Sequence, residues 1–553
     1  MNHADSQDTF SQDTFSQDTV PDRADRPHSE MQGKDYAPTA ATPAPPRHTV
    51  LLACALVLVF AGLATYLRFK SLGLRSLWHD EFATWHVSRM PLLESLYWQP
   101  ELTKPPLYQF LLRMLSSDPK PSEWVLRFPA ALCGTLLIPL VGWVCLRFRQ
   151  LSCAAPAALL LACHGLLIEY SQEARPYTLL VLGSLAATLC WYEFTRRATM
   201  PWAIGYIATA WLTFYGHYLT ILLFGCHTAW LGWLYLFGRS AVDGDADDLC
   251  RSDTSTSTAR KLVPGVTVLV ITAAGCVPMV WHYLANRQST FQGLDWISPL
   301  SWLSIWQTLT SLGHGNIWVL FLVIPSLAIV IYFGTTFAGA GYASHKRITY
   351  DDPICLLFLW FLAAWGGLVI LSLVGRPALV DRYALPAAVP LILIPLFVLS
   401  RVHRWLPMVA AVVIVLANAE IWINAATRYQ PGIREMAGYL RSDARGQDEM
   451  VVLTIDNTTF PNWEDMERSI FAYYSLGDSP YEELHLDADG VTAKNEILRD
   501  PRGMLLVIGW ADPFAILARA GRRTDPIIYE GESYAQLLFD PYRLVRVAPL
   551  DDY

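Results

Sequence analysis

Charged residues are scarce in this chain: Asp, Glu, Lys and Arg together make up 16% of its 553 residues, against roughly 25% in ordinary soluble domains. Hydrophobic residues reach 53%, and the mean hydropathy is +0.28. The apolar residues fall in blocks of about 18–22, the length needed to cross roughly 30 Å of hydrocarbon. The composition therefore predicts a polytopic α-helical membrane protein embedded in a lipid bilayer.

Three further absences narrow the class of protein. The chain has no surplus of positive charge. Its formal net charge is -8, and a negative net charge suggests no nucleic-acid partner. No CxxC pair occurs among the ten cysteines, which lie between Cys54 and Cys355 and almost all within apolar segments. Cysteines in such segments are expected to act as small buried core residues, and the cysteine-free C-terminal region cannot depend on disulfides. That region also has no phosphate-binding glycine motif.

The first 48 residues differ from the rest of the chain. Ser6-Gln7-Asp8-Thr9-Phe10 recurs at 11–15 and again, ending in Val20, at 16–20. A five-residue polar repeat is too short for a solenoid unit, and several prolines follow it, so 1–48 is predicted to be a disordered cytoplasmic tail. The first apolar run starts too late for a signal peptide and lacks a small-residue cleavage site. We therefore expect 49–67 to be a retained first span.

About eleven spans are predicted within 49–424. They lie near 49–67, 127–147, 153–170, 176–195, 201–218, 219–237, 262–281, 317–336, 354–374, 384–400 and 406–424. With the N-terminus inside the cell, every short inside loop is basic, as the positive-inside rule requires. The apolar segment 105–115 is too short to span and is predicted to be an amphipathic helix in the outer interface. The long outer loop 286–316, with Trp296, Trp302 and Trp306, is expected to be an amphipathic flap or a plain interfacial helix.

The composition becomes soluble after residue 424. Short apolar, β-branched runs at 450–455 and 504–508 are typical of buried strands, and 464–476 is a predicted helix between them. Residues 425–553 are therefore expected to form a small extracytoplasmic α/β domain, with a core of its own. Its role is left open by the sequence.

The unusual polar residues gather at the predicted outer ends of the spans. Adjacent carboxylates at a membrane surface are costly unless they bind a cation, a proton or a polar substrate. Because these residues were not used to orient the chain, their convergence predicts one extracytoplasmic site. They are Asp80-Glu81, Lys104-Pro105-Pro106, Ser171-Gln172-Glu173-Ala174-Arg175, Gly216-His217-Tyr218, Gly375-Arg376 and Asp381-Arg382-Tyr383.

Each of these residues also has a structural interpretation. Asp80 and Glu81 would then lie in a solvated loop, and Lys104 would be a snorkelling anchor. Glu173 and Arg175 would pair with one another at a helix end. Arg382 would anchor a span against the headgroups, and the histidines His79, His86 and His217 are more often structural hydrogen-bonding groups than ligands.

The order of the motifs resembles the membrane glycosyltransferases of the GT-C fold. The motifs are the acidic pair in the first outer loop, Lys104-Pro105-Pro106-Leu107-Tyr108, Arg127-Phe128-Pro129-Ala130-Ala131, Gln172-Glu173-Ala174-Arg175-Pro176-Tyr177 and Arg382-Tyr383. The resemblance covers about residues 49–424 and is nearest to the branch that includes protein O-mannosyltransferases and the lipid A aminoarabinose and galacturonic acid transferases. It implies an enzyme that transfers a sugar from a polyprenyl phosphate to a glycan, lipid or protein hydroxyl, with inversion at the anomeric carbon.

The resemblance also implies roles for individual residues. Asp80 matches the catalytic base, with Glu81 beside it, and Lys104 matches the residue that contacts the lipid phosphate. The arginines Arg382, Arg376 and Arg175 are expected to share the charge of the leaving phosphate, because a guanidinium suits phosphate oxygens. Glu81 and Glu173 are candidate ligands for a divalent cation, Mg²⁺ or Mn²⁺, whose requirement is left open.

Two other functions have to be weighed against a transferase. A transporter or lipid flippase also has many spans, but it usually carries charges near the bilayer midplane and has repeated halves. Here the polar residues gather at one face, and no repeated half is evident. A non-catalytic protein that binds lipid-linked sugars differs from the transferase only in its lack of activity. The sequence therefore favours a glycosyltransferase of the inner, cytoplasmic membrane.

Overall fold

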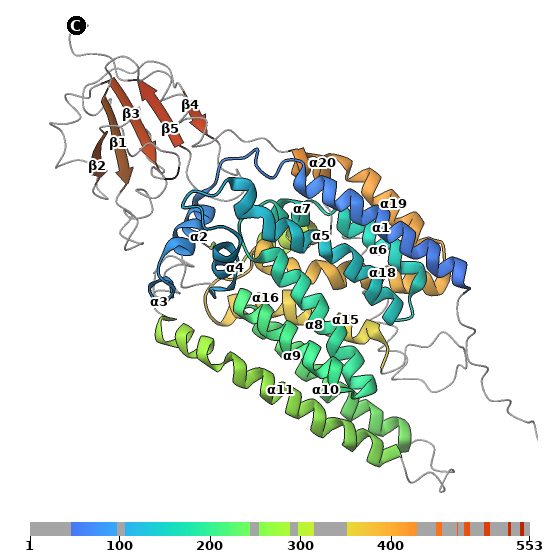
Figure 1. The fold of residues 1–553 in the computed structure, drawn as a ribbon. Coiled ribbons are helices and arrows are strands. Elements are labelled where there is room, and N and C mark those ends of the chain that lie inside the picture. Colours follow the sequence, from blue (N-terminus) through green and yellow to red (C-terminus); the bar gives the residue numbers. More distant parts are fainter. Residues whose placement is uncertain are drawn as a thin grey trace, which may run out of the picture. The chain divides into compact units, whose positions relative to one another are not determined.

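The computed structural model describes most of the predicted membrane part and a smaller share of the C-terminal region (Figure 1). The described residues are 46–96, 105–243, 254–287, 297–313, 351–427, 449–455, 473, 481–486, 503–508, 529–531 and 542–546. The predicted tail up to residue 45, the predicted span 317–336 and Lys104 lie outside them. So does the predicted helix 464–476, apart from Tyr473.

The described membrane part is helical, as the composition predicts. Most of its helices coincide with the apolar blocks. The helices are α1 (Arg47–Phe69), α2 (His79–Arg89), α3 (Leu92–Ser95), α4 (Leu107–Leu115), α5 (Glu123–Arg147), α6 (Leu151–Ala162), α7 (Gly165–Ser171), α8 (Tyr177–Arg197), α9 (Met200–Gly216), α10 (Thr220–Asp243), α11 (Thr254–Ala285), α13 (Trp302–Leu312), α15 (Pro353–Phe361), the π-helix η2 (Leu362–Gly366), α16 (Gly367–Val374), α17 (Asp381–Ala384), the 3-10 helix η3 (Leu385–Ala387), α18 (Ala388–Val402), α19 (Leu406–Ala417) and α20 (Ala419–Thr427). Prolines are tolerated inside α5, α6, α11 and α18 because lipid-embedded helices find other partners for the freed backbone groups.

The described helices support an integral membrane protein. Seven of them are long and apolar enough to cross a membrane, or up to nine if each of two bent pairs is one span. The bent pairs are α6–α7, with a bend of 59°, and α19–α20, with a bend of 62°. The helix α9, at the predicted span 201–218, has 17 residues. Because 317–336 lies outside the described residues, the count of eleven stays a prediction.

The break between α6 and α7 is stabilised by a side chain from another helix. Arg68, in the last turn of α1, is fully buried. Its guanidinium donates hydrogen bonds to the carbonyls of Leu161 and Ala162, both at 3.0 Å, and to Ser171 Oγ at 3.2 Å. These carbonyls end α6, where the bend removes their helical partners. The close approach of α5 to α7 needs a glycine at residue 134, because a Cβ there would lie 2.1 Å from Ser171 Oγ.

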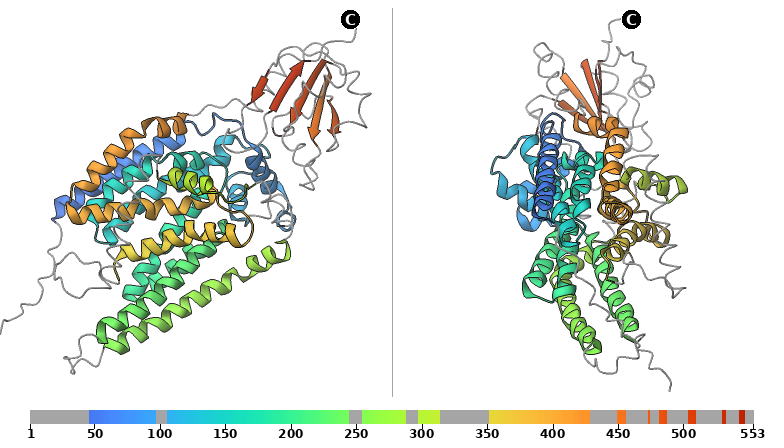
Figure 2. Two further views of the ribbon diagram at one scale, coloured as in Figure 1. Left: turned by 180° about the vertical axis from the view of Figure 1, so that it is seen from behind. Right: turned by 90° about the vertical axis from the view of Figure 1, so that its right-hand side faces the viewer.

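The helices pack into a bundle around a continuous buried core. α5 contacts α6 and α8, and α8 packs along α9, with short connections that make consecutive helices neighbours. The helix α11 lies at the margin of the bundle, where it contacts α9 and α10 (Figure 2). Many apolar side chains on the outside are exposed, as a lipid-facing surface requires, among them Leu51, Val59 and Val270.

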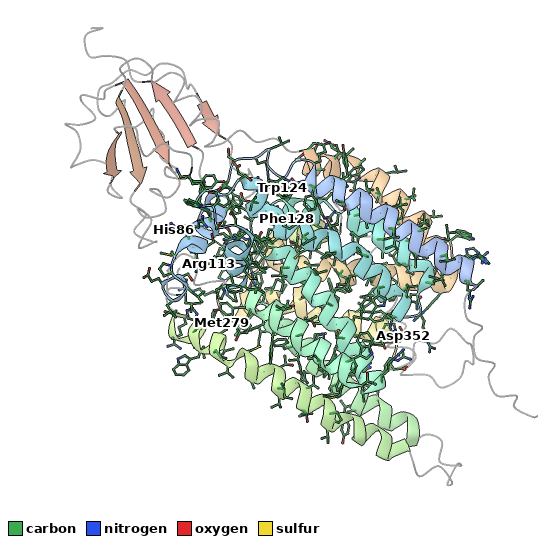
Figure 3. The ribbon with its side chains drawn as sticks, viewed as in Figure 1. His86, Arg113, Trp124, Phe128, Met279 and Asp352 are labelled. Carbon is green, nitrogen blue, oxygen red and sulfur yellow. The ribbon has the colours of Figure 1, made fainter. Side chains whose placement is uncertain are left out.

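The two ends of the bundle differ in their charged residues. His86 on α2 and Asp352, just before α15, lie at opposite ends (Figure 3). At the end marked by Asp352, the carboxylate of Asp352 pairs with Arg401. Arg401 lies between the predicted spans 384–400 and 406–424, in a predicted inside loop that is basic, and α2 lies within the predicted first outer loop. The predicted outer and inner loops therefore lie at opposite ends of the bundle, as the predicted topology requires. Which end faces the cytoplasm stays a prediction.

Two short helices are amphipathic. The helix α4, in the predicted interfacial segment 105–115, buries Tyr108 and Leu112 and exposes Phe110 and Met114. The helix α13, in the predicted flap 286–316, begins with a capping box between Ser301 and Ser304. Its exposed side includes Trp302, Leu303 and Trp306, and its other side buries Thr308, Thr310 and Leu312. Both helices are short for a span.

The described C-terminal strands form a mixed sheet of five strands in the order β2-β1-β3-β5-β4. Its central pair, β1 and β3, coincides with the two predicted strands and is parallel, with Glu449 opposite Gly503. Parallel neighbours require a crossover connection, but most residues between β1 and β3 lie outside the described ones, so the α/β domain stays a prediction. The strands are β1 (Glu449–Ile455), β2 (Tyr481–Leu486), β3 (Gly503–Ile508), β4 (Tyr529–Gly531) and β5 (Tyr542–Arg546).

Candidate functional site

The candidate site is organised around the first turn of α2, which contains Asp80 and Glu81. Carboxylates in the first turn are favoured there because the amino end of a helix carries partial positive charge. Neighbouring helical residues point about 100° apart, so the two carboxylates enter different surroundings. Glu81 is completely buried, whereas the side chain of Asp80 is 21% exposed. Asp80 and Glu81, which are adjacent in the sequence, therefore have different surroundings in the structure.

Glu81 is engaged by several donors. Arg127 donates through Nε to Oε1 at 2.8 Å and through Nη2 to Oε2 at 2.7 Å. The backbone amide of Ala174 donates to Oε1 at 2.7 Å, and that of Trp78 to Oε2 at 3.2 Å. Burial alone would raise the pKa of Glu81, but the charge and hydrogen bonds of Arg127 lower it below its ordinary value. The carboxylate is therefore held ionised in a fixed position.

Arg127 connects Glu81 to the loop that leads into α2. Its remaining bonds run to the carbonyls of Leu72, Arg75 and Ser76, each at 2.9 Å. The guanidinium thus sets the path of the loop and the start of α2 together. From the sequence, Arg127 was identified only as part of a motif, and no role was predicted for it. The signal it missed is an arginine inside a predicted span, which requires a partner.

Asp80 lies between two buried guanidinium groups. Its Oδ2 is 3.3 Å from Arg175 Nη2 and 3.4 Å from Arg382 Nη1. Arg175 and Arg382 lie 95 and 302 residues further along the chain, so only the fold brings the three together. Charge-assisted hydrogen bonds are typically about 2.7–2.9 Å long. The contacts of Asp80 with these two arginines are therefore longer than those of Glu81 with Arg127, and Asp80 is the more exposed carboxylate.

The two arginines are positioned in different ways. Arg175 Nη1 donates to the carbonyl of Asp80 at 2.8 Å and to Thr84 Oγ1 at 2.6 Å, which ties it to α2. The guanidinium carbon of Arg382 lies over the rings of Tyr177 and Tyr383, at 5.9 Å and 5.6 Å from their centres. Aromatic faces attract a guanidinium. Within this trio two positive charges face one negative charge, so the cluster suits an anion.

The other predicted site residues are placed as follows. Arg376 is exposed in the loop between α16 and α17 and does not share the burial of Arg175 and Arg382. Lys104 lies outside the described residues. Glu173 is buried, and within the described part of the chain its Oε2 has no hydrogen-bond partner. The alternative pairing of Glu173 with Arg175 is not the one the structure has, because Arg175 pairs with Asp80.

The predicted cation ligands do not fit a divalent metal ion. Both oxygens of Glu81 accept bonds from Arg127 at 2.7–2.8 Å, so this carboxylate is committed to a cation of the protein itself. Among the residues that the structure describes, no group of three or more His, Cys, Asp or Glu side chains is arranged to hold a metal ion. We derive no step of the chemistry through a metal.

The buried carboxyl of Glu173 predicts a pH-dependent stability. Burial raises its pKa well above the ordinary value, although Arg75 partly opposes the shift. The stabilising contribution of such a group is present below its unfolded pKa and is lost as the pH rises through its folded pKa. Glu173→Gln removes that loss, so its stability advantage over the wild type is expected to grow from about pH 5 to about pH 9. Thermal unfolding of the detergent-solubilised protein across this range measures the difference.

Glu81→Gln provides the contrast for this prediction. Because the pKa of Glu81 is lowered, its contribution is present above the ordinary carboxyl pKa and is lost as the pH falls. The two variants should therefore diverge from the wild type in opposite directions along the pH axis. Parallel profiles for Glu173→Gln and the wild type would contradict a raised pKa.

One residue of the C-terminal region packs beside α2. The ring of Tyr473 makes edge-to-face contacts with Trp85 and Phe82, with ring centres 5.0 Å and 5.9 Å apart. Its hydroxyl donates to the carbonyl of Pro121 at 2.7 Å. Such aromatic pairs stabilise their partners beyond simple burial. Tyr473 therefore adds to the packing that holds α2 and its first-turn carboxylates.

Comparison with known protein families supports the resemblance over part of the chain. Residues 90–241 match the family described as dolichyl-phosphate-mannose-protein mannosyltransferase. This segment contains Arg127, Arg175 and Tyr177, whereas Asp80 and Arg382 lie outside it. No significant match to a curated protein sequence is found.

Several solved structures are similar to the chain at low identity. ArnT from Cupriavidus metallidurans, bound to undecaprenyl phosphate, is 14% identical with a TM-score of 0.47, over 89% of this chain and 98% of that one. The archaeal oligosaccharyltransferase AglB from Archaeoglobus fulgidus, in complex with an inhibitory peptide and a dolichol-phosphate, is 11% identical with a TM-score of 0.47, over 84% and 70%. The Saccharomyces cerevisiae (S. cerevisiae) Pmt1-Pmt2 complex bound to the sugar donor is 14% identical with a TM-score of 0.33, over 48% and 37%. At these identities the likeness does not extend to activity.

Proposed function

We propose that this membrane protein is a glycosyltransferase that moves a sugar from a polyprenyl phosphate to a hydroxyl acceptor. The observation that carries the proposal is the trio of Asp80, Arg175 and Arg382, a partly exposed carboxylate between two buried guanidinium groups. Such a trio offers a proton acceptor and an anion-binding group side by side. The family match over residues 90–241 supports the same reaction class.

Asp80 acts as the general base in this proposal. The acceptor oxygen attacks the anomeric carbon of the sugar from the side opposite the phosphate, and Asp80 takes the hydroxyl proton. The bond from the anomeric carbon to the phosphate oxygen breaks, and its electron pair leaves with the phosphate, so the configuration inverts. No acid is needed, because the phosphate is already an adequate leaving group. A carboxylate that is partly exposed is reachable by the acceptor.

Arg382 and Arg175 bind the phosphate and stabilise the charge that develops on it. Both are almost completely buried, and a positive charge shielded from water stabilises an anion more strongly than an exposed one. The contact from Arg382 to Asp80 is long, at 3.4 Å, so a phosphate can take its place at little cost. Lys104, by its match to the resemblance, is proposed to add a third positive charge, whereas the exposed position of Arg376 supports a lesser role.

Glu81 is proposed to act as a positioning residue. Its carboxylate is committed to Arg127 and to two backbone amides, and this fixes the first turn of α2. Fixing this turn also fixes the position of Asp80, because Asp80 is the preceding residue of the same turn. Glu81 therefore acts through Asp80 and Arg127 in the proposed reaction.

The reaction is proposed to take place at the outer face of the cytoplasmic membrane. The basic loops support an inside position for the end of the bundle marked by Asp352, and α2 lies at the opposite end. The amphipathic helix α4 follows directly on α2 and α3, as an interfacial helix beside such a site would. The C-terminal region is proposed to lie on the same side. The acceptor of the transferred sugar is proposed to be a hydroxyl group of a glycan, a lipid or a protein.

Transfer of label from radioactive polyprenyl-phosphate sugars tests the function. The purified protein in liposomes is expected to move label from at least one donor of a panel into an added membrane acceptor fraction. The same liposomes, with fluorescent polyprenyl-phosphate sugar in one leaflet, measure lipid flipping. Flipping without transfer would replace the proposal by a flippase, an alternative that the comparisons do not support. Saturable donor binding without either activity would make the protein a binding protein.

A further inference from the structure

Two buried polar atoms lie next to the trio of Asp80, Arg175 and Arg382. Tyr177 is 0% exposed and His217 is 3% exposed. In the part of the chain that the structure describes, neither the Tyr177 hydroxyl nor Nε2 of His217 has a hydrogen-bond partner. Native proteins leave few buried polar groups unpaired, so each such group requires an explanation. A ligand that completes their hydrogen bonds is one.

The two atoms belong to one cluster around Arg382. The ring of Tyr177 lies under the Arg382 guanidinium, and the ring centre of His217 is 5.9 Å from that of Tyr177 and 5.6 Å from that of Tyr383. The Tyr177 hydroxyl interacts electrostatically with Arg382, Arg175 and Asp80. The His217 imidazole interacts with both arginines. The unpaired atoms therefore adjoin the groups proposed to bind the donor.

The backbone fixes the hydrogen-bonding character of His217. Its Nδ1 accepts a hydrogen bond from the amide of Leu219 at 3.3 Å. A neutral imidazole that accepts through Nδ1 carries its proton on Nε2, so the unpaired nitrogen is a donor. The Tyr177 hydroxyl both donates and accepts. Uncharged groups of this kind complement sugar hydroxyls, whereas the phosphate charge is answered by the two arginines.

We propose that His217 Nε2 and the Tyr177 hydroxyl bind hydroxyl groups of the sugar on the lipid donor and thereby select which sugar is transferred. This inference rests on the proposed transferase function and deepens it. The sequence favours a structural role for His217, and the structure accounts for only one of its two ring nitrogens in that way. A site built to hydrogen-bond a substrate hydroxyl discriminates strongly against an analogue that lacks it.

Matched variants separate a ligand-binding role from a structural one. Tyr177→Phe removes a hydroxyl without a protein partner, so thermal stability is expected to be unchanged or higher. Tyr206→Phe removes a hydroxyl that pairs with His227 Nδ1 at 3.1 Å and is expected to lower stability. His217→Gln is matched by His227→Gln, because the Nε2 of His227 also pairs with Thr188, at 3.2 Å. The His227 and Tyr206 variants should keep the sugar preference of the wild type.

Kinetics with defined donors test the inference. The donors are polyprenyl phosphates that carry mannose, glucose, galactose or arabinose, and singly deoxygenated forms of the one transferred fastest. Tyr177→Phe and His217→Gln are each expected to lower kcat/KM for that donor by about tenfold. With the deoxy donor that lacks the contacted hydroxyl, variant and wild type should be equal. Inhibition by sugar-free polyprenyl phosphate should change by less than about twofold.

Three outcomes would overturn the inference. Unchanged kcat/KM with every donor would mean that the two atoms bind no part of it. An equal loss of affinity for sugar-free polyprenyl phosphate would assign them to the phosphate. A loss of kcat/KM that is the same for every deoxy donor would mean that no sugar hydroxyl is contacted.

Binding separates a failure of this inference from a failure of the proposed function. If the wild type transfers no sugar from any donor, the transferase proposal fails. Thermal protection by sugar-linked and sugar-free polyprenyl phosphate then still tests the subsite. Loss of only the extra protection given by the sugar, in Tyr177→Phe and His217→Gln, would support it, and equal protection in all variants would refute it.

Discussion

Asp80→Asn is expected to reduce sugar transfer by about 10²–10⁴-fold, the usual contribution of a general base. Asparagine keeps the size of the side chain and an oxygen for the two arginines, but it cannot take the acceptor proton. The change also removes the negative charge that competes with phosphate for Arg175 and Arg382, which lie 3.3 Å and 3.4 Å from it. Binding of sugar-free polyprenyl phosphate should therefore be as tight as in the wild type or tighter. Single-turnover transfer and equilibrium binding measure the two effects separately.

The control for this variant is Asp118→Asn. Asp118 lies in an exposed loop, where its carboxylate accepts a hydrogen bond from the amide of Lys120 at 2.8 Å. It should keep both transfer and binding. Transfer by Asp80→Asn at the wild-type rate would remove Asp80 as the base. Weaker phosphate binding in Asp80→Asn would contradict the competition between Asp80 and the ligand.

Glu81→Gln is expected to destabilise the protein by about 3–5 kcal/mol, the cost of removing one partner of a buried ion pair. The loss leaves the Arg127 guanidinium buried without a counter-charge, and Arg127 is 1% exposed. Transfer should fall as well, because the first turn of α2 is no longer fixed. The fall should be smaller than that of Asp80→Asn when both are measured well below the unfolding temperature. Chemical and thermal unfolding in detergent, beside transfer assays, measure both.

Glu94→Gln is the matched control, since Glu94 is exposed on α3. The double variant Glu81→Leu with Arg127→Met tests the ion pair directly, because replacing both buried charges often costs little. It should recover only part of the stability, since the carbonyls of Leu72, Arg75 and Ser76 lose their donor. Full stability of Glu81→Gln combined with a complete loss of transfer would instead make Glu81 catalytic.

The helices of the membrane part could be predicted from the sequence because lipid imposes a length and an apolar composition on each span. The short segment 105–115 was recognised as something other than a span for the same reason, and it forms α4. The bends of α6–α7 and α19–α20 were not predicted. A bend within an apolar block leaves no compositional trace, because its free carbonyls are served by a side chain from elsewhere, as Arg68 serves Leu161 and Ala162.

The candidate site could be predicted in part. Asp80, Arg175 and Arg382 were each identified from their position at a span end, and they do come together. The different surroundings of Asp80 and Glu81 were not predicted, because adjacent letters do not reveal which side of a helix faces the core. Arg127 was missed because its partner Glu81 lies 46 residues away in the sequence. The proposed roles of all these residues stay predictions until they are measured.

The buried Arg68 has a consequence for the making of the protein. Its acceptor at Ala162 is 94 residues further along the chain, which at about 5–20 residues per second takes on the order of 5–20 s to synthesise. During that interval the first span is in the membrane while the carbonyls that will bind its arginine do not yet exist. Headgroups and water can serve the arginine during that interval. We therefore expect the contact between α1 and α6 to form only after the third predicted span has been synthesised.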